Sequence, residues 1–502
     1  MSNQTESKNT LNRRNFLGLA GAALAAAPTL TAQPTAEERP HRPQSTSDSR
    51  PNFLFMIADD LMFRTIHSIN NKEVRTPNLD RLVREGCHFT HCFHQGSWTG
   101  AVCIASRTML LTGLTAFHAH QAIPDNQSAQ VPVWCQTFRE KGYHTAITGK
   151  WHLDAVSLQR AFCEQTAVGP GYLDSTHKMP HSMYNRPAPG NLWDPADKTQ
   201  EGHWLDLGLW ERGKKGEIKH SSEVYADAAI EFLGRQKDSQ QPFFLYLGFN
   251  APHDPRQAPQ DFLDMYPVDS IEVPPNFLPE HPFDQGEHRT RDELLAPFPR
   301  TEQAVKTHRR EYYAIISHMD AQIGRILEAL DRSGKAANTY VIMTADHGLA
   351  VGEHGLMGKQ NPYECSMRMP LIMRGPRIQA GKQVDHMVYQ HQMYATTCDL
   401  AGIEKPSHLE FPSLAPMLLN QTSEPVYDAM FGWLHTVQRS IRTERYKLIY
   451  YIHLNRYQLF DLQEDPWEMH DQIHNPALAQ LKSELINRLH RMQRDLNDPL
   501  AS

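Results

Sequence analysis

The sequence lacks any long hydrophobic run after residue 32, so it offers no stretch of about 20 apolar residues that could cross a bilayer as a helix. It also lacks a strong charge of either sign, since 50 Lys and Arg against 57 Asp and Glu leave a formal net charge of -7 over 502 residues. This mild balance gives no reason to expect nucleic acid or an anionic membrane surface as a partner. We therefore expect neither partner and no stable membrane span.

Cysteine is scarce as well. The seven cysteines form no C-x-x-C pair, which argues against zinc bound by thiolates. Their number is odd, and chemical modification of one cysteine would leave six. Six cysteines are compatible with disulfides but do not establish any. Apolar side chains, in contrast, make up 40% of the 502 residues, enough to bury a large core. We expect one large and one smaller domain.

Residues 1–32 predict an export signal. Adjacent arginines, Arg13 and Arg14, precede a short run of small apolar residues at 18–27. This order is typical of a signal peptide, because the apolar run is too short for a membrane span. The paired arginines resemble a twin-arginine signal, which carries folded proteins across a bacterial membrane. The expected location is periplasmic or extracellular, with residues 33–50 as a linker.

Strand and helix patterns alternate along most of the chain. Residues 52–58 form a continuous apolar run, as expected for a buried parallel strand, and residues 339–344 form a β-branched one. This alternation predicts an α/β fold with a mostly parallel central sheet flanked by helices over residues 51–420. Short antiparallel strands and a closing helix predict a smaller α+β domain at 421–502.

Other stretches predict helices or loops. A helix is expected directly after Cys103, and a long amphipathic helix over 304–333 with Gly334 as its C-cap. Residues 155–220 and 254–300 are rich in Pro, Gly and His and have weak periodicity. We expect them to be long loops over the functional site, where substrate specificity usually resides.

Carboxylates follow two of the predicted strands. Asp59 and Asp60 come directly after the first strand, and Asp346 and His347 come after the strand at 339–344. Either pair alone is more often an ordinary turn. Together they place three carboxylates and one imidazole at the same edge of one sheet, a donor set that suits hard divalent cations such as Ca²⁺ or Mg²⁺.

Cys103 opens a predicted helix, and Arg107 lies one turn later on the same face. The free N–H groups and the dipole at a helix N-terminus favour an anionic group, so Cys103 could be a nucleophilic thiolate. Taken alone, a small buried hydrophobic side chain opening a core helix is the more frequent explanation.

Further cations and imidazoles follow other strands. Lys150 and His152 lie in G-K-W-H, His253 ends N-A-P-H, and Lys359 belongs to a glycine-rich loop. Each alone could be a solvated surface side chain or a core histidine. Together with a metal they could contact an anionic group, whose transfer depends mainly on positioning and charge stabilisation.

The motif C-I-A-S-R at 103–107, with T-G at 112–113, resembles the signature of the type I, formylglycine-dependent sulfatases of the alkaline phosphatase-like superfamily. Ala105 stands where proline is commoner, a variant that the signature tolerates. The similarity extends to I-A-D-D, G-K-W-H, N-A-P-H, T-A-D-H-G and G-E-H-G-L-M-G-K-Q-N-P-Y-E, and it covers residues 51–470 with order and spacing kept.

The resemblance implies a nucleophile and a metal site. Cys103 would be oxidised to formylglycine, one oxygen of whose aldehyde hydrate attacks sulfur and displaces the alcohol. Deprotonation of the other hydrate oxygen then releases sulfate as the aldehyde reforms. One divalent ion, Ca²⁺ in the first place and Mg²⁺ as the alternative, would be held by residue 103 and by Asp59, Asp60, Asp346 and His347. Family members often have an amide at the position of His347.

The resemblance also assigns roles to the cations. Arg107 and Lys150 would support the hydrate and the sulfate, and His152 would act as the base in hydrate breakdown. His253 and Lys359 would contact the sulfate and help to protonate the leaving oxygen. A formylglycine-generating enzyme is the implied partner during maturation.

The predicted function is hydrolysis of sulfate esters, with a sulfated carbohydrate as the expected substrate class. Aryl or choline sulfate would use the same core. One alternative is a phosphodiesterase or phosphonate hydrolase, because related folds cleave phosphoryl esters with similar metal ligands. Another is a non-catalytic protein that binds sulfated glycans and leaves Cys103 unmodified.

Overall fold

The computed structural model describes residues 50–123, 128–169, 218–287 and 290–501, together with 186–187 and scattered positions from 191 to 204. The predicted export signal and nearly all of the linker lie outside the described residues. Residues 44–502 form one compact unit.

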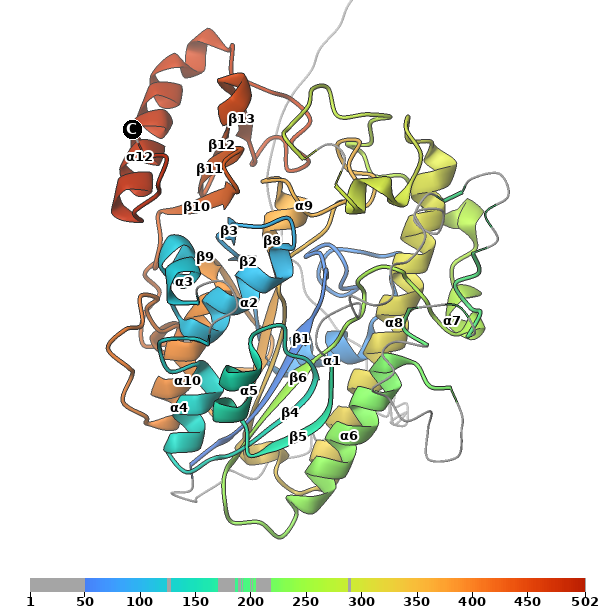
Figure 1. Cartoon of the computed structure of the whole chain (residues 1–502), viewed down its shortest axis with the longest axis vertical. Helices are drawn as coiled ribbons and strands as arrows, with labels where there is room; N and C mark the ends of the chain where they lie inside the picture. Colours follow the sequence, from blue (N-terminus) through green and yellow to red (C-terminus); the bar gives the residue numbers. More distant parts are fainter. Residues whose placement is uncertain are drawn as a thin grey trace, which may run out of the picture. The chain divides into compact units, whose positions relative to one another are not determined.

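The larger sheet has eight strands in the order β5-β4-β6-β1-β7-β8-β2-β9 (Figure 1). All of them run in the same direction except β8, which is antiparallel to both β7 and β2. In sheet order, the bounds are β5 Glu164–Gly169, β4 His144–Lys150, β6 Phe243–Gly248, β1 Asn52–Ala58, β7 Thr339–Ala345, β8 Arg368–Arg374, β2 Cys87–Phe93 and β9 Lys382–Tyr389.

Helices cover both faces of this sheet (Figure 1). The central strands β1, β6 and β7 are buried along their whole length, because apolar side chains on both of their faces pack under helices. One helical layer contains α1 Pro77–Glu85, α6 Ser221–Arg235, α7 Gln260–Leu263 and the long α8 Glu302–Arg332. The other contains α2 Val102–Thr112, α3 Ala116–Ala122, α4 Trp134–Glu140, α5 Ala155–Ala161 and α10 Met393–Ala401.

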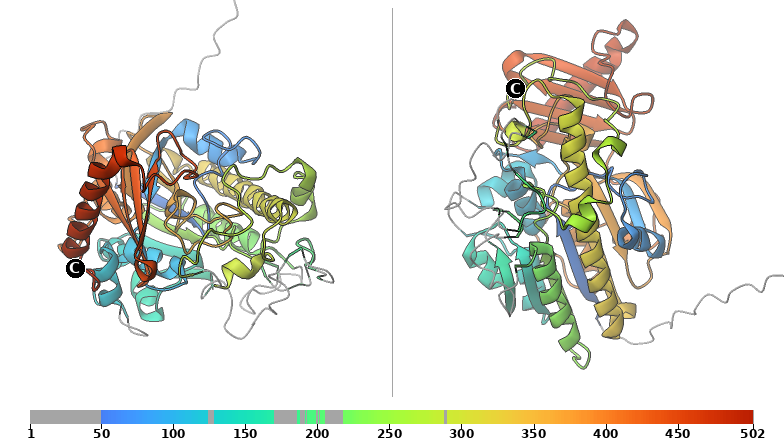
Figure 2. Two further views of the ribbon diagram at one scale, coloured as in Figure 1. Left: turned by 90° about the horizontal axis from the view of Figure 1, so that it is seen from above. Right: turned by 90° about the vertical axis from the view of Figure 1, so that its right-hand side faces the viewer.

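The smaller sheet has five strands in the order β13-β12-β11-β10-β3, and Figure 2 shows α12 lying along it. Its first four strands are antiparallel, whereas β3, which comes from before α2, pairs with β10 in parallel. Leu485 and Leu489 of α12 are buried against the sheet. The bounds are β3 Gly96–Ser97, β10 Ala429–Leu434, β11 Gln438–Thr443, β12 Tyr446–Tyr451, β13 Arg456–Asp461 and α12 Ala479–Asp495, with short helices α9 Glu364–Met367 and α11 Ala415–Leu418 before the sheet.

The predicted fold class is confirmed: a mostly parallel sheet flanked by helices and a smaller, mostly antiparallel sheet. The prediction of loops throughout 155–220 is wrong at the start of this stretch, where α5 and β5 occupy most of residues 155–169. Asp154 caps α5 by accepting a hydrogen bond from the Ser157 N–H, a local signal that the weak apolar periodicity obscured. Helix α8 ends one residue earlier than expected, with Ser333 as C-cap and Gly334 following at φ +74°.

Among the described residues, no single helix is long and apolar enough to span a membrane. The pair α2 and α3 meets that test only when joined across a bend of 87°. All seven cysteines are free thiols in this structure, and only Cys163 is exposed.

A buried ion pair fastens the end of the chain to the smaller sheet. The Arg439 guanidinium on β11 donates from Nε and Nη2 to the Asp498 carboxylate, at 2.6 and 2.9 Å. Burial acts to raise the pKa of Asp498, but hydrogen bonds from Arg439 and Gln493 outweigh it and hold the pKa below its usual 3.8. The stabilisation is therefore present above about pH 4 and is lost as the pH falls through the folded-state pKa.

We predict that Asp498→Asn lowers the free energy of unfolding by about 3 kcal/mol at pH 7, because Arg439 is left buried without its counter-ion. The difference from the wild type should shrink below pH 4. Thermal and urea unfolding at pH 7, 5 and 3.5 measure both effects. Asp461→Asn, which removes an exposed pair with Arg445 on the same sheet, serves as the control and should change the free energy of unfolding much less.

Candidate active site

Two adjacent strands bring the predicted carboxylates together. Ala58 at the end of β1 pairs in register with Ala345 at the end of β7, so the residues that follow emerge side by side. The Asp60 N–H donates to Asp346 Oδ1 at 3.2 Å, and Asp60 adopts a left-handed backbone with φ +67°. Asp59, Asp60 and Asp346 are all fully buried. The strand register therefore concentrates three carboxylates in one small volume.

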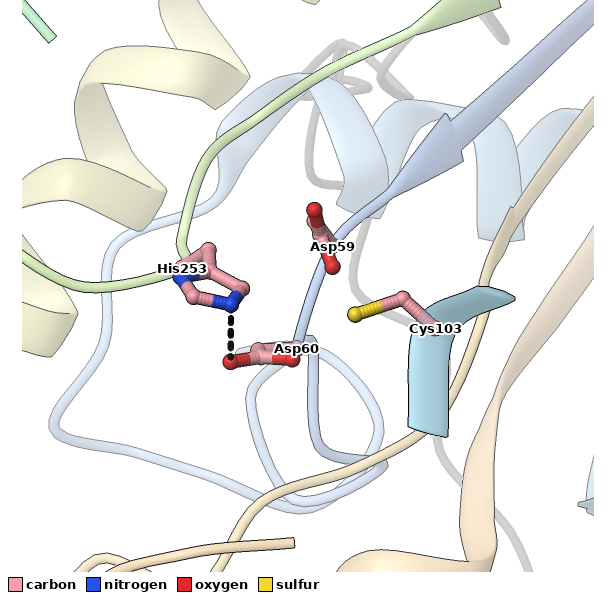
Figure 3. Close-up of side chains that lie close together, drawn as sticks. All are labelled: Asp59, Asp60, Cys103 and His253. Atoms are coloured by element: carbon pink, nitrogen blue, oxygen red, sulfur yellow. Dashed lines mark ion pairs between the residues drawn. The ribbon is translucent and has the colours of Figure 1, made fainter. Parts of the chain in front are cut away.

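Cys103 is the second residue of α2. Its side chain reaches the carboxylate cluster from the helical layer that contains α2, α3, α4, α5 and α10. Figure 3 shows its sulfur pointing into the space that Asp59, Asp60 and His253 also face. Each of these four residues offers a ligand atom within 4.8 Å of the others, and the same holds for Asp59, Cys103, Asp346 and His347. The predicted position of Cys103 at a helix N-terminus is confirmed.

Three buried cations balance the carboxylates. Lys150, the last residue of β4, pairs with Asp59. Arg107 Nε donates to Asp346 Oδ2 at 3.0 Å, and Arg107 Nη1 donates to the Lys150 carbonyl at 3.2 Å. Lys359 Nζ lies 2.8 Å from Asp60 Oδ1 and 3.5 Å from Cys103 Sγ. Arg107 thus contacts a carboxylate directly.

The balance of burial and charge shifts the pKa values in opposite directions. Burial and Asp346 act to raise the pKa of Asp59, but Lys150, His253 and Arg107 outweigh them and lower it. Burial raises the pKa of Asp60 to about 7 despite Lys359 and His347.

Burial and nearby charges also act in opposite directions on the pKa of the Cys103 thiol. Burial and Asp59 act to raise its pKa, yet Lys150 and Lys359 leave it below the usual 9.0. The cluster therefore favours an anionic group at position 103.

Three histidines border the cluster. His253 Nδ1 donates to the Asp254 carbonyl at 2.8 Å, which leaves Nε2 as the acceptor for Lys359 Nζ at 3.0 Å. Burial and Lys359 hold the pKa of His253 well below its usual value. Burial and Lys150 do the same for the pKa of His152, whose backbone is left-handed at φ +67°. His347 Nε2 lies 3.3 Å from Asp60 Oδ1.

The residues present fit a divalent cation. Asp59 Oδ1, Asp60 Oδ2 and His347 Nε2 are buried, and none of them has a hydrogen-bond partner among the described residues. Buried acceptors without donors are costly unless an ion or water satisfies them. Asp59, Asp60 and Asp346 supply hard oxygen donors of the kind that Ca²⁺ and Mg²⁺ prefer.

A cavity of about 500 Å³ opens onto the cluster. The predicted residues Cys103, Lys150, His152, His253 and Lys359 line it. The prediction missed its other lining residues: Gly100, Ala101, Thr290, Arg291, Asp292 and Gln360. Residues 290–292 lie in the stretch expected to set specificity, but nothing in their local pattern distinguished them from other polar loop residues.

The Gln360 side chain forms hydrogen bonds with three parts of the cavity wall. Its side-chain Nε2 donates to the Gly100 carbonyl at 2.8 Å and to Asp292 Oδ2 at 2.7 Å, while Oε1 accepts from the Lys359 N–H at 3.1 Å. Gly100 precedes the helix that carries Cys103. Gln360 therefore couples the position of Lys359 to that of residue 103.

The smaller sheet also supports the site. Lys447 Nζ on β12 donates to the Pro362 carbonyl at 3.0 Å and pairs with Glu364 and Glu468 at 2.9 and 2.8 Å. Pro362 lies three residues after Lys359, so this buried cluster fastens the loop that carries Lys359. The structure thus brings every predicted site residue to one place, whereas their individual roles stay predictions.

The sequence matches the family model described as Sulfatase over residues 51–403 and the one described as N-sulphoglucosamine sulphohydrolase, C-terminal, over residues 352–495. N-acetylglucosamine-6-O-sulfatase of Bacteroides thetaiotaomicron is 26% identical over 91% of this chain and 88% of that protein.

Two solved structures show the same fold. A protein in complex with its substrate D-glucosamine-2-N,6-O-disulfate superposes with a TM-score of 0.70 at 23% identity, covering 90% of this chain and 99% of that one. The phosphonate monoester hydrolase of Silicibacter pomeroyi also gives a TM-score of 0.70, at 20% identity, with 89% and 96% covered. At these identities the superpositions establish the architecture and leave the substrate open.

We predict that removal of divalent metal destabilises the protein, because the buried oxygens Asp59 Oδ1 and Asp60 Oδ2 then lose their partner. A chelator should lower the melting temperature of the wild type, and excess Ca²⁺ should restore it. Asp60→Asn should reduce bound metal, measured by elemental analysis, and should weaken the effect of the chelator.

Asp320→Asn is the matched control for a buried carboxylate. Asp320 instead accepts hydrogen bonds from the backbone N–H groups of Asn78 and Leu79, at 3.1 and 2.8 Å. This variant should keep the full response to the chelator. An equal response in Asp60→Asn and the wild type, with equal metal content, would contradict the metal site.

Proposed function

The chain belongs to the sulfatase family and is a sulfuric ester hydrolase, and from this premise we propose that it hydrolyses sulfate esters of carbohydrates with residue 103 as the nucleophile. The observation that carries the proposal is the position of Cys103 Sγ, 3.5 Å from Lys359 Nζ and at the base of the cavity. An anionic ester entering this cavity meets Lys150, Lys359 and the imidazoles of His152 and His253.

The proposed nucleophile is formylglycine, formed by oxidation of Cys103 during maturation, whose aldehyde hydrate supplies an oxygen for attack on sulfur. A formylglycine-generating enzyme is the proposed maturation partner. The surroundings support this proposal, since they lower the pKa of the group at position 103 and would favour a deprotonated hydrate oxygen in the same place.

The metal would be held by Asp59, Asp60, Asp346, His347 and residue 103, and as a Lewis acid it would stabilise negative charge on the nucleophile and the sulfate. Ca²⁺ is the proposed ion, because the set is dominated by carboxylate oxygens. His347 is the least typical member of this set.

The remaining residues position the ester and handle protons. Lys150 and Arg107 hold Asp59 and Asp346 in place and add positive charge next to residue 103. Lys359 Nζ donates to His253 Nε2 across 3.0 Å, so this pair can deliver the Lys359 proton to the leaving oxygen through His253. His152, neutral because of its lowered pKa, is the proposed base for release of sulfate.

A carbohydrate substrate is supported by the relatives, of which N-acetylglucosamine-6-O-sulfatase is one. A phosphonate or phosphodiester hydrolase remains the second candidate, favoured by the similar fold of the phosphonate monoester hydrolase. Comparison of 4-nitrophenyl sulfate with 4-nitrophenyl phenylphosphonate separates the two, and a higher kcat/KM with the sulfate is expected. The proposed location is the periplasm or the extracellular space, on the strength of the N-terminal twin-arginine pattern.

We predict that Cys103→Ala lowers kcat with 4-nitrophenyl sulfate on the order of 10³-fold or more, because the covalent step loses its nucleophile. The melting temperature should change little, since one sulfur atom is removed from the cavity wall. The control variant is Cys163→Ala, because Cys163 is an exposed thiol that lies far from Cys103 in the sequence. This variant should keep wild-type kcat. Wild-type turnover by Cys103→Ala would refute the proposal and would require another nucleophile.

We predict that His253→Ala harms poor leaving groups more than good ones. A sugar alkoxide needs a proton as the ester bond breaks, whereas 4-nitrophenolate hardly does, so loss of the path from Lys359 through His253 should cost about 10² more in kcat/KM with a sulfated sugar than with 4-nitrophenyl sulfate. His391→Ala, at a buried histidine outside the cavity lining, serves as the control. Equal losses on both substrates would assign His253 to binding alone.

A further inference from the structure

A second cavity, called here the Arg456 cavity, lies outside the site described above. Its volume is about 260 Å³, and its walls come from the loop at 275–282, from His354 and Tyr363, from β13, and from residues 468–471. Among the residues that the structure describes, it shares no lining residue with the catalytic cavity. Nothing in the proposed hydrolysis uses it.

The walls of the Arg456 cavity are amphipathic. Phe277, Phe460 and Tyr363 present aromatic surface, and Gln458 and Asp471 present polar groups. The Tyr363 and Tyr451 hydroxyls both donate to Gln458 Oε1, at 2.9 and 2.8 Å. Because these bonds fix the carbonyl end of the Gln458 amide, its N–H groups remain as donors toward the cavity, with no acceptor among the described residues.

The rim carries an exposed cation. The Arg456 guanidinium stands 4.1 Å from the centroid of the Phe283 ring and makes no ion pair with any residue that the structure describes. Stacking on the ring restrains this side chain at the opening. An exposed arginine that is held in place but carries no counter-ion is suited to an anionic ligand.

Apolar side chains are exposed at the same rim. Leu278 and Met469 line the cavity and are 38% and 48% exposed. They are two of five large hydrophobic side chains exposed in the described part of the chain, and a third, Leu454, lies two residues before Arg456. Clustered exposed apolar groups with a polar border typically mark a binding site.

We propose that the Arg456 cavity binds a sugar unit of the substrate glycan other than the one whose sulfate ester is hydrolysed, and that this unit carries a negatively charged group. A pyranose ring offers C–H faces to Phe277, Leu278 and Met469 and hydroxyls to Gln458 and Asp471. Arg456 would pair with the sulfate or carboxylate of that unit. This inference rests on the proposed function, because it assumes a glycan substrate.

One loop connects the two cavities. Lys359 lines the catalytic cavity and Tyr363 lines the Arg456 cavity, and these residues are four positions apart. Their Cα atoms are therefore no more than about 14 Å from each other. A short oligosaccharide can extend over that distance, whereas a monosaccharide or an aryl ester in the catalytic cavity would leave the Arg456 cavity without a ligand.

Direct binding tests the proposal without turnover. Sulfated tetrasaccharides from heparan sulfate, chondroitin sulfate and carrageenan are titrated calorimetrically into the Cys103→Ala protein and into the Cys103→Ala/Arg456→Gln protein. We expect at least one of them to bind, with a Kd raised about tenfold by Arg456→Gln. The control Arg445→Gln removes an arginine of the same sheet that already pairs with Asp461, and it should leave Kd unchanged.

Kinetics give the second readout. In the active enzyme, Arg456→Gln and Met469→Ser should lower kcat/KM for a hydrolysed tetrasaccharide about tenfold more than for 4-nitrophenyl sulfate. The loss should appear in KM.

Three results would overturn the proposal: no tetrasaccharide binds, the Kd is the same with and without Arg456, or both esters lose kcat/KM equally. Hydrolysis of 4-nitrophenyl sulfate by the enzyme that keeps residue 103, with and without Arg456→Gln, shows whether the proposed function itself holds. Loss of this hydrolysis in protein that carries formylglycine would refute the function, and normal hydrolysis with unchanged Kd values would refute the Arg456 cavity alone.

Discussion

The structure depends on the balance of opposite charges buried at the carboxyl ends of β1 and β7. Three carboxylates and three cations lie in a region with almost no exposure to solvent, where an unpaired charge would be far more costly than in water. Lys150, Arg107 and Lys359 each pair with a different one of Asp59, Asp346 and Asp60. The proposed function uses this balance, because the cations that neutralise the carboxylates would also face the anionic ester beside the proposed metal.

This balance is assembled from distant parts of the chain. The strands supply the carboxylates through their register, α2 supplies residue 103, and the loop before α9 supplies Lys359. That loop is fastened at one point by Gln360 and, three residues after Lys359, by Lys447 of the smaller sheet. The smaller sheet therefore does more than extend the fold, since it fixes one wall of the catalytic cavity. The Arg456 cavity lies at the same junction, where a glycan could contact both parts of the chain.

Sequence patterns predicted the fold class, the central strands and the residues of the buried cluster. The fully apolar strands β1, β6 and β7 are strong signals because both faces are buried, and the polar residues that end them stand out for the same reason. The strands β2, β5, β8 and β9 were missed; in β2 and β9, His88, Thr90 and Asp385 interrupt the apolar pattern. Arg291, Asp292 and Gln360 could not be singled out, because their role in lining the cavity comes from loop packing that no local periodicity encodes.

The central claim is that residue 103 acts as formylglycine within this charge cluster. The most direct test is the mass of the peptide that contains residue 103, in active protein purified from a host with a formylglycine-generating enzyme. The account predicts the mass of the aldehyde or its hydrate, in a fraction that rises in proportion to specific activity. An unmodified Cys103 thiol in protein that hydrolyses sulfate esters at full rate would contradict it.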